Sequence, residues 1–187
     1  KNIINNHGYK FEIINGVDVC YLTGSNPSHY SRKWNKLARQ MIAQLHQKTP
    51  IDVIHSQSMG ANGVLKWAKS NSIPIVSTWH GTNLTELSAH FSSASYNPRY
   101  WHWLVITPIT MLTRYLTMEL PIRKASSAIT LVSPTLEKHM RKHANGKVIT
   151  IPNGVFIPKN PGTNFDSKVL ELISIGRLVK QKGVQHA

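Results

Sequence analysis

Short apolar segments alternate with helix-like segments along most of the chain, and this alternation limits the fold more than any other feature. Apolar runs of this kind, bounded by Gly, Pro or Ser, are typical of buried strands. Helical crossovers between successive strands make the strands parallel and pack helices on the sheet. The pattern therefore predicts an α/β fold with a doubly wound parallel sheet, with strands expected at 51–55, 73–78, 128–132, 147–151 and 169–175.

Two helices and one pair of strands carry signals of their own. Residues 31–48 have apolar side chains at i, i+3, i+4 and i+7, which predicts one amphipathic helix. Ser133 is a good N-cap residue and is followed by proline, so a second helix is expected over 134–143. Residues 10–22 are strand-like, with Gly16 in a turn.

The composition changes after residue 156. Residues 157–168 are rich in Pro, Gly and Asn, which is typical of a linker. We therefore predict a first domain over 1–156, an interdomain linker over 157–168 and the start of a second domain over 169–187. The chain begins without Met and ends within an expected helix start, so we interpret it as part of a longer protein, incomplete at its N-terminus.

The chain is strongly basic, with 22 Lys and Arg against 8 Asp and Glu and a formal net charge of +14. Such a charge favours anionic partners, which include nucleic acid, an anionic membrane surface and phosphorylated substrates. The single cysteine, Cys20, excludes an internal disulfide framework and is interpreted as a buried thiol. We expect a cytoplasmic location.

A basic glycine-containing segment follows the last expected strand. Gly176 closes that strand, and Arg177 and Lys182 stand five positions apart before an expected helix. Ligands of open parallel sheets bind at the carboxyl ends of strands, and Arg and Lys suit phosphate oxygens. The segment is a candidate diphosphate site, with a solvated basic turn as the alternative.

His80 and Gly81 come directly after the strand expected at 73–78. That place is where a substrate would bind, and glycine permits a close backbone approach. The alternative is a histidine that caps a helix or is hydrogen-bonded in the core.

The order of these motifs resembles glycosyltransferase family 4. Relatives show an Asp-Val-x-His strand, a strand ending in His-Gly, an Ala-x-x-Val-Ser strand–helix step, a Pro-Asn-Gly-Val turn and a Gly-Arg-Leu segment before Lys-Gly. The matching residues here are Asp52-Val53-Ile54-His55, Trp79-His80-Gly81, Ala128 through Val132-Ser133, Pro152-Asn153-Gly154-Val155, and Gly176-Arg177-Leu178 with Lys182-Gly183.

The resemblance implies a GT-B fold, in which 1–156 is the Rossmann-like acceptor-side domain and 169–187 begins the domain that binds the donor nucleotide. It implies a retaining transferase that moves a sugar from a nucleotide-diphosphate sugar to an acceptor. The acceptor would be lipid-linked or a precursor of a cell-surface glycan. No cofactor and no metal are expected, and the histidines of the sequence show no ligand-like cluster.

The resemblance also implies roles for single residues. Arg177, Lys182 and the backbone at Gly176 would neutralise the donor diphosphate as it leaves. His80 would lie beside the transferred sugar and is the candidate catalytic residue. The expected lining of the interdomain cleft comprises Gly81, Ser133, Asn153 and Gly154.

The chain departs from the family pattern in two respects. Many relatives carry a second histidine where this chain has Gln57. The Gly-rich loop expected before residue 1 and the paired glutamates expected after residue 187 are not in this sequence. We therefore expect this piece alone to be inactive.

Other functions remain open from the sequence. A non-transferase GT-B enzyme, such as a nucleotide-sugar epimerase, would share most of these motifs, and a basic binding domain without activity could keep the fold. A nucleic-acid-binding module is disfavoured, because the basic residues are spread out and no nucleic-acid motif is present. The donor sugar, the acceptor and the linkage are not determined.

Residues 92–124 are rich in aromatic and apolar side chains. Their apolar run is shorter than the roughly 20 residues that span a bilayer, but Trp and Tyr favour the membrane interface. The segment predicts peripheral docking on the inner face of an anionic membrane, and the alternative is a helix packed into its own domain. The residues expected at the membrane are Trp101, Trp103, Arg99 and Arg114, with Arg123 and Lys124 as nearby basic residues.

Overall fold

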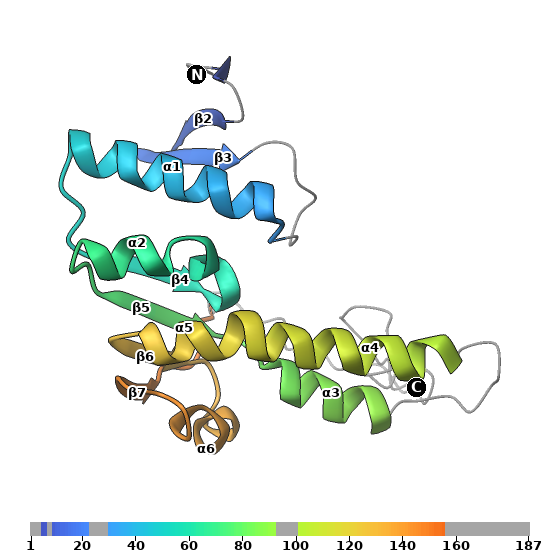
Figure 1. The fold of residues 1–187 in the computed structure, drawn as a ribbon. Helices are drawn as coiled ribbons and strands as arrows, with labels where there is room; N and C mark the ends of the chain where they lie inside the picture. The colour runs from blue at the N-terminus through green and yellow to red at the C-terminus, as the bar shows by residue number, and fades with distance from the viewer. Residues whose placement is uncertain (1–4, 7–8, 23–29, 93–100, 156–187) are drawn as a thin grey trace, which may run out of the picture.

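A computed structural model describes residues 5–6, 9–22, 30–92 and 101–155. A four-stranded parallel sheet forms its centre, with the strands side by side in the order β4-β5-β6-β7 (Figure 1). The predicted Rossmann-like α/β fold is therefore confirmed. The strands are β4 (Ile54–Gln57), β5 (Ile75–Trp79), β6 (Ala128–Leu131) and β7 (Lys147–Thr150).

The N-terminal strands form a separate antiparallel sheet rather than part of the parallel one. Its order is β1 (Asn5–Asn6), β2 (Tyr9–Ile14) and β3 (Val17–Leu22). Asn15 and Gly16 join β2 to β3 with φ angles of 51° and 81°. Positive φ at both residues of an Asn-Gly turn is typical of a tight hairpin, which makes the two strands antiparallel.

The predicted amphipathic helix is confirmed as α1 (Arg32–Lys48). Ser31 caps it by accepting a hydrogen bond from the Trp34 backbone N–H at 3.1 Å. The helix packs closely on the 3₁₀ segment η1 (Ser58–Gly63), where a Cβ on Gly63 would lie 2.8 Å from the Asn35 Cα.

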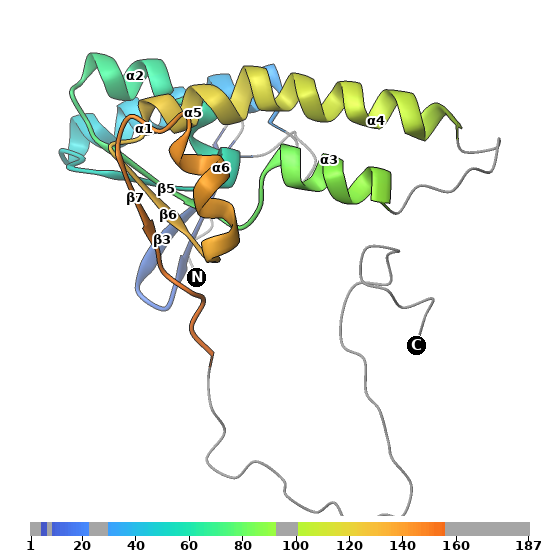
Figure 2. The ribbon, with the colours of Figure 1, turned by 90° about the horizontal axis from the view of Figure 1, so that it is seen from below.

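One continuous helical run extends well beyond the sheet. It consists of α4 (Trp101–Arg114), the π-helical segment η3 (Tyr115–Glu119) and α5 (Leu120–Ala125), and α4 projects away from the strands alongside α3 (Asn83–Ser92) (Figure 2). The remaining helices are short: α2 (Leu65–Ser70), η4 (Pro134–Leu136) and α6 (Glu137–Arg141). Ser133 caps η4, as predicted, by accepting from the Thr135 backbone N–H.

The two faces of the parallel sheet differ in burial. Trp79, Ile129 and Leu131 are buried in a core with residues of α5, η4 and α6. Helical crossovers that advance in one direction lie on one face of a sheet, because each is right-handed. The opposite face carries the exposed side chains of β4 and β7 and is left open in the described residues.

Three local expectations differ from the structure or lie outside it. The first parallel strand starts at Ile54 rather than Ile51, and it alternates in burial instead of being buried throughout. Cys20 is half-buried, and this burial raises the pKa of its thiol. The predicted linker at 157–168 and the second-domain start at 169–187 lie outside the described residues.

Candidate functional site

A row of polar side chains crosses the open face of the sheet. His55 Nε2 lies 2.8 Å from Thr78 Oγ1, and Thr78 Oγ1 lies 2.5 Å from Thr130 Oγ1. These residues come from β4, β5 and β6 in turn, and side chains two apart on a strand share a face. Sequence reasoning missed the row, because polar residues stand at adjacent positions in β4 and β5 and no sequence pattern separates those of the open face.

His80 extends this polar surface to the carboxyl ends of the strands. It follows β5 directly, its side chain is exposed, and its Nε2 lies 3.0 Å from Oε1 of Gln57 at the end of β4. Thr82, not His80, caps the following helix, because Thr82 Oγ1 accepts from the Thr85 backbone N–H at 3.0 Å. His80 is therefore neither a core histidine nor a helix cap, so both alternatives from the sequence are excluded.

A hollow of about 570 Å³ lies on this face and brings three of the predicted residues together: His80, Asn153 and Gly154. Gly81 and Ser133 follow β5 and β6 but are not among its lining residues. No Lys, Arg, Asp or Glu from the described part of the chain lines it, and its polar side chains are hydroxyl, amide and imidazole groups. The lining comprises Val53, His55, Gln57, Val76, Thr78, His80, Thr130, Val132, Ile151, Pro152, Asn153 and Gly154.

Such a lining suits an uncharged, hydroxyl-bearing ligand. Hydroxyl and amide groups donate and accept hydrogen bonds, and the apolar residues between them can contact the faces of a sugar ring. A free phosphate would find no Lys or Arg among these residues.

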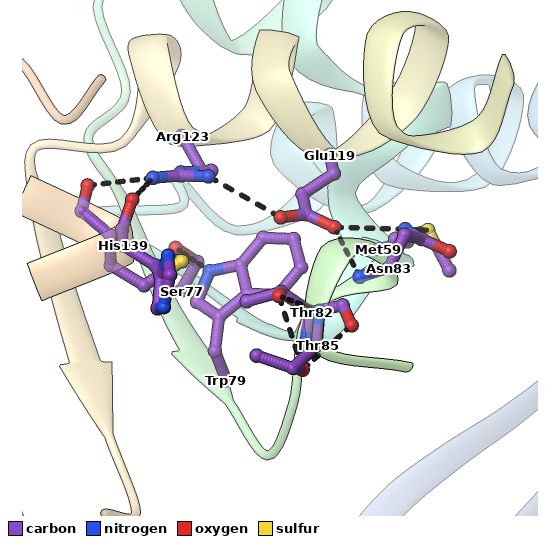
Figure 3. Close-up of polar contacts among 10 residues, drawn as sticks. Met59, Ser77, Trp79, Thr82, Asn83, Thr85, Glu119, Arg123 and His139 are labelled. Carbon is purple, nitrogen blue, oxygen red and sulfur yellow. Dashed lines mark hydrogen bonds and ion pairs between the residues drawn. The ribbon is translucent and has the colours of Figure 1, made fainter. Parts of the chain in front are cut away.

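Residues 80–82 connect β5 to α3 and are called the His80 loop. A buried polar network lies next to the start of α3, where this loop ends (Figure 3). Glu119 is 0% exposed, and its Oε2 accepts from both the backbone N and the side-chain Nδ2 of Asn83 at 2.8 Å. Arg123 is 1% exposed and lies 3.4 Å from Glu119 Oε1. Arg123 also donates to the carbonyl oxygens of His139 and Met140. The interpretation of Arg123 as a basic residue near a membrane is therefore wrong, because the guanidinium is buried in an ion pair.

The outer surface of α4 is apolar and exposed. Its exposed stripe consists of Val105, Ile109 and Leu112 and continues to Leu116 in η3, with Trp103 and Ile106 beside it. Arg114 is exposed at the end of the helix and, with Trp103 and Ile106, lines a shallow hollow of about 270 Å³. Trp101 is the first residue of α4, whereas Arg99 lies outside the described residues. None of the helices that the structure describes is both long and apolar enough to cross a bilayer.

The predicted diphosphate residues Gly176, Arg177 and Lys182 lie outside the described residues, so their placement stays a prediction. Within the described ranges, no three His, Cys, Asp or Glu side chains are grouped as a metal site requires.

Comparison with known families explains this arrangement of motifs. Residues 6–157 match the sequence model described as Glycosyltransferase Family 4. The chain belongs to glycosyltransferase family 4. The match spans the hairpin, the whole parallel sheet and the loop with Asn153 and Gly154, so the family 4 domain includes every residue of the hollow. No curated protein matches the chain in sequence.

Proposed function

We propose that this family 4 domain belongs to a retaining glycosyltransferase that moves a sugar from a nucleotide-diphosphate sugar to an acceptor hydroxyl. The observation that carries the proposal is the exposed His80, hydrogen-bonded to Gln57 beside a hollow without Lys, Arg, Asp or Glu at the carboxyl end of β5. Ligands of open α/β sheets bind at this edge.

The two ends of the donor need different chemistry. The sugar unit is uncharged and suits the neutral surface beside His80, which would hydrogen-bond one of its hydroxyl groups. The diphosphate gains negative charge as the bond to the sugar breaks, and Arg177 and Lys182 would stabilise that charge. The proposal uses no metal ion and no cofactor.

Turnover by the intact enzyme tests this proposal. The protein is incubated with nucleotide-sugars that differ in base and in sugar, and release of nucleoside diphosphate is measured. We expect release with one donor class, and an NMR spectrum of the product that retains the anomeric configuration of the donor. An inverted product would overturn the retaining mechanism. Interconversion of the donor sugar without transfer would indicate an epimerase, and no reaction with any donor would favour a binding domain.

We also propose that the acceptor is reached at a membrane. The exposed apolar stripe of α4 and the neighbouring Arg114 combine the two features of a peripheral docking surface, apolar insertion and positive charge. A lipid-linked acceptor would be held at the cytoplasmic face of an anionic membrane. The test of this surface is the last prediction in the Discussion.

A further inference from the structure

The N-terminus of α3 directly follows the His80 loop, and side chains of the same chain already accept hydrogen bonds from its first backbone N–H groups. Glu119 accepts from the Asn83 backbone N–H, which belongs to the first residue of the helix. Thr82 and Thr85 satisfy each other, since each side chain accepts from the other's backbone N–H. A helix start of this kind usually attracts anions, but here a carboxylate of the same chain occupies it.

The other end of the network reaches the helix after β6. Arg123 pairs with Glu119 and donates to the carbonyl oxygens of His139 and Met140 in α6. The pair therefore joins the loop after β5 to the helix after β6, although neither element contains Glu119 or Arg123. Both connections start at the carboxyl end of the sheet, where His80 lies.

Stability alone gives a weak reason for this arrangement. Desolvation of two buried charges costs about as much as their attraction returns, and apolar residues of similar size often stabilise as well. An ion pair with directed hydrogen bonds does, however, fix the positions of the segments that it joins. Glu119 also ends a π-helical segment, and such segments occur often at functional sites.

We propose that Glu119 is a positioning residue that holds the His80 loop through Asn83, with Arg123 anchoring its carboxylate to α6. This inference rests on the proposed function, because it assigns His80 to the transferred sugar. Because the Glu119 carboxylate already occupies the start of α3, the donor diphosphate does not bind there.

Asn83→Ala in the intact enzyme is the principal test. It removes the Nδ2 hydrogen bond to Glu119 but leaves the backbone hydrogen bond and the Glu119–Arg123 pair in place. We expect kcat to fall about five- to tenfold, as for one lost hydrogen bond, while KM for the donor stays within about twofold. Glu119→Gln removes the charge and should lower kcat further.

A matched control is Glu137→Gln. Glu137 also pairs with an arginine four residues later, Arg141, but that pair is far more exposed, and its other hydrogen bonds go to Thr150 and Val148 of β7. Its kcat should equal that of the unmodified enzyme.

The imidazole NMR signal of His80 separates positioning from general stability. His80→Ala identifies the signal by its loss. In Asn83→Ala and Glu119→Gln we expect it to move, while it stays in place in Glu137→Gln. A fall in melting temperature without a shift of this signal, or unchanged kcat in both loop variants, would overturn the inference. Full activity of His80→Ala would instead overturn the proposed role of His80.

Discussion

Nε2 of His80 lies 3.0 Å from Oε1 of Gln57, so the ends of β4 and β5 are joined by a side-chain hydrogen bond at the edge of the sheet. The resemblance to family 4 predicts a second histidine at the position of Gln57. A glutamine amide can orient an imidazole by a hydrogen bond, but the amide, unlike a second histidine, does not titrate near neutral pH. In this chain His80 is therefore oriented by a neutral partner.

His80→Ala should lower kcat much more than it raises KM for the donor. A hydrogen bond to a sugar hydroxyl strengthens as the ring becomes oxocarbenium-like in the transition state, and a contribution of about 1.5–3 kcal/mol corresponds to roughly 10- to 150-fold in rate. Gln57→Ala should lower kcat less, because it loosens the imidazole without removing it. Steady-state kinetics with the preferred donor measure both effects, and His143→Ala, on the turn after α6, is the control. Unchanged kcat in His80→Ala would remove His80 from the site.

Arg177→Ala and Lys182→Ala should each weaken use of the donor. Loss of one charge-assisted contact to a phosphate costs about 1.5–3 kcal/mol, so kcat/KM for the donor should fall roughly 10- to 150-fold. Lys180→Ala is a matched control, since it removes a positive charge from the same segment outside the Gly-Arg-Leu and Lys-Gly motifs. If all three variants retain full kcat/KM, the segment is a solvated basic turn.

The sequence predicted those elements whose signals are local. The periodicity of 31–48 and the N-cap at Ser133 depend on neighbours within a few residues, and the structure confirms both helix starts. The strands β5, β6 and β7 were also predicted, because each contains a short apolar run and is preceded by Pro, Ser or Gly.

The contacts between elements could not be predicted in the same way. The hydrogen bond between His80 and Gln57 depends on the register of β4 against β5, which no single segment determines. Glu119 drew no prediction and Arg123 was expected near a membrane, and only the position of Asn83 and α6 around them explains their burial. The sequence therefore did not predict these contacts, because each depends on how segments far apart in the chain pack together.

Gly146→Ala should destabilise the fold, although Gly146 is not among the residues that line the hollow. A Cβ at this position would lie 2.2 Å from the carbonyl oxygen of Ser127, which is backbone and cannot swing aside. We expect a loss of about 1–3 kcal/mol in the free energy of unfolding, measured by urea denaturation. Gly154→Ala is the control, because nothing lies within 4 Å of its Cβ position. Equal stability of the two variants would contradict the close approach of Gly146 to Ser127.

The apolar stripe on α4 leads to the last prediction. Val105, Ile109, Leu112 and Leu116 follow one another at helical spacing, and each side chain is at least 48% exposed. Scattered exposed apolar residues are normal in proteins, but a continuous stripe of this kind marks an interaction surface. These four side chains are therefore not packed into the core of the domain, which was the alternative for this segment.

The intact protein should therefore co-sediment with anionic vesicles and bind neutral vesicles more weakly. Binding should fall as salt is raised, because each Lys or Arg near an anionic leaflet contributes about 1 kcal/mol that salt screens. Trp103→Ala combined with Ile109→Ser should lower binding about tenfold or more, because these side chains would enter the interface. Val17→Ser is the matched control, because Val17 is 62% exposed but lies on the β2–β3 hairpin. If the protein stays in the supernatant at low salt, or if the α4 variant binds as well as the control, α4 does not dock on a membrane. The acceptor would then be water-soluble, and the charge of +14 would serve another anionic partner.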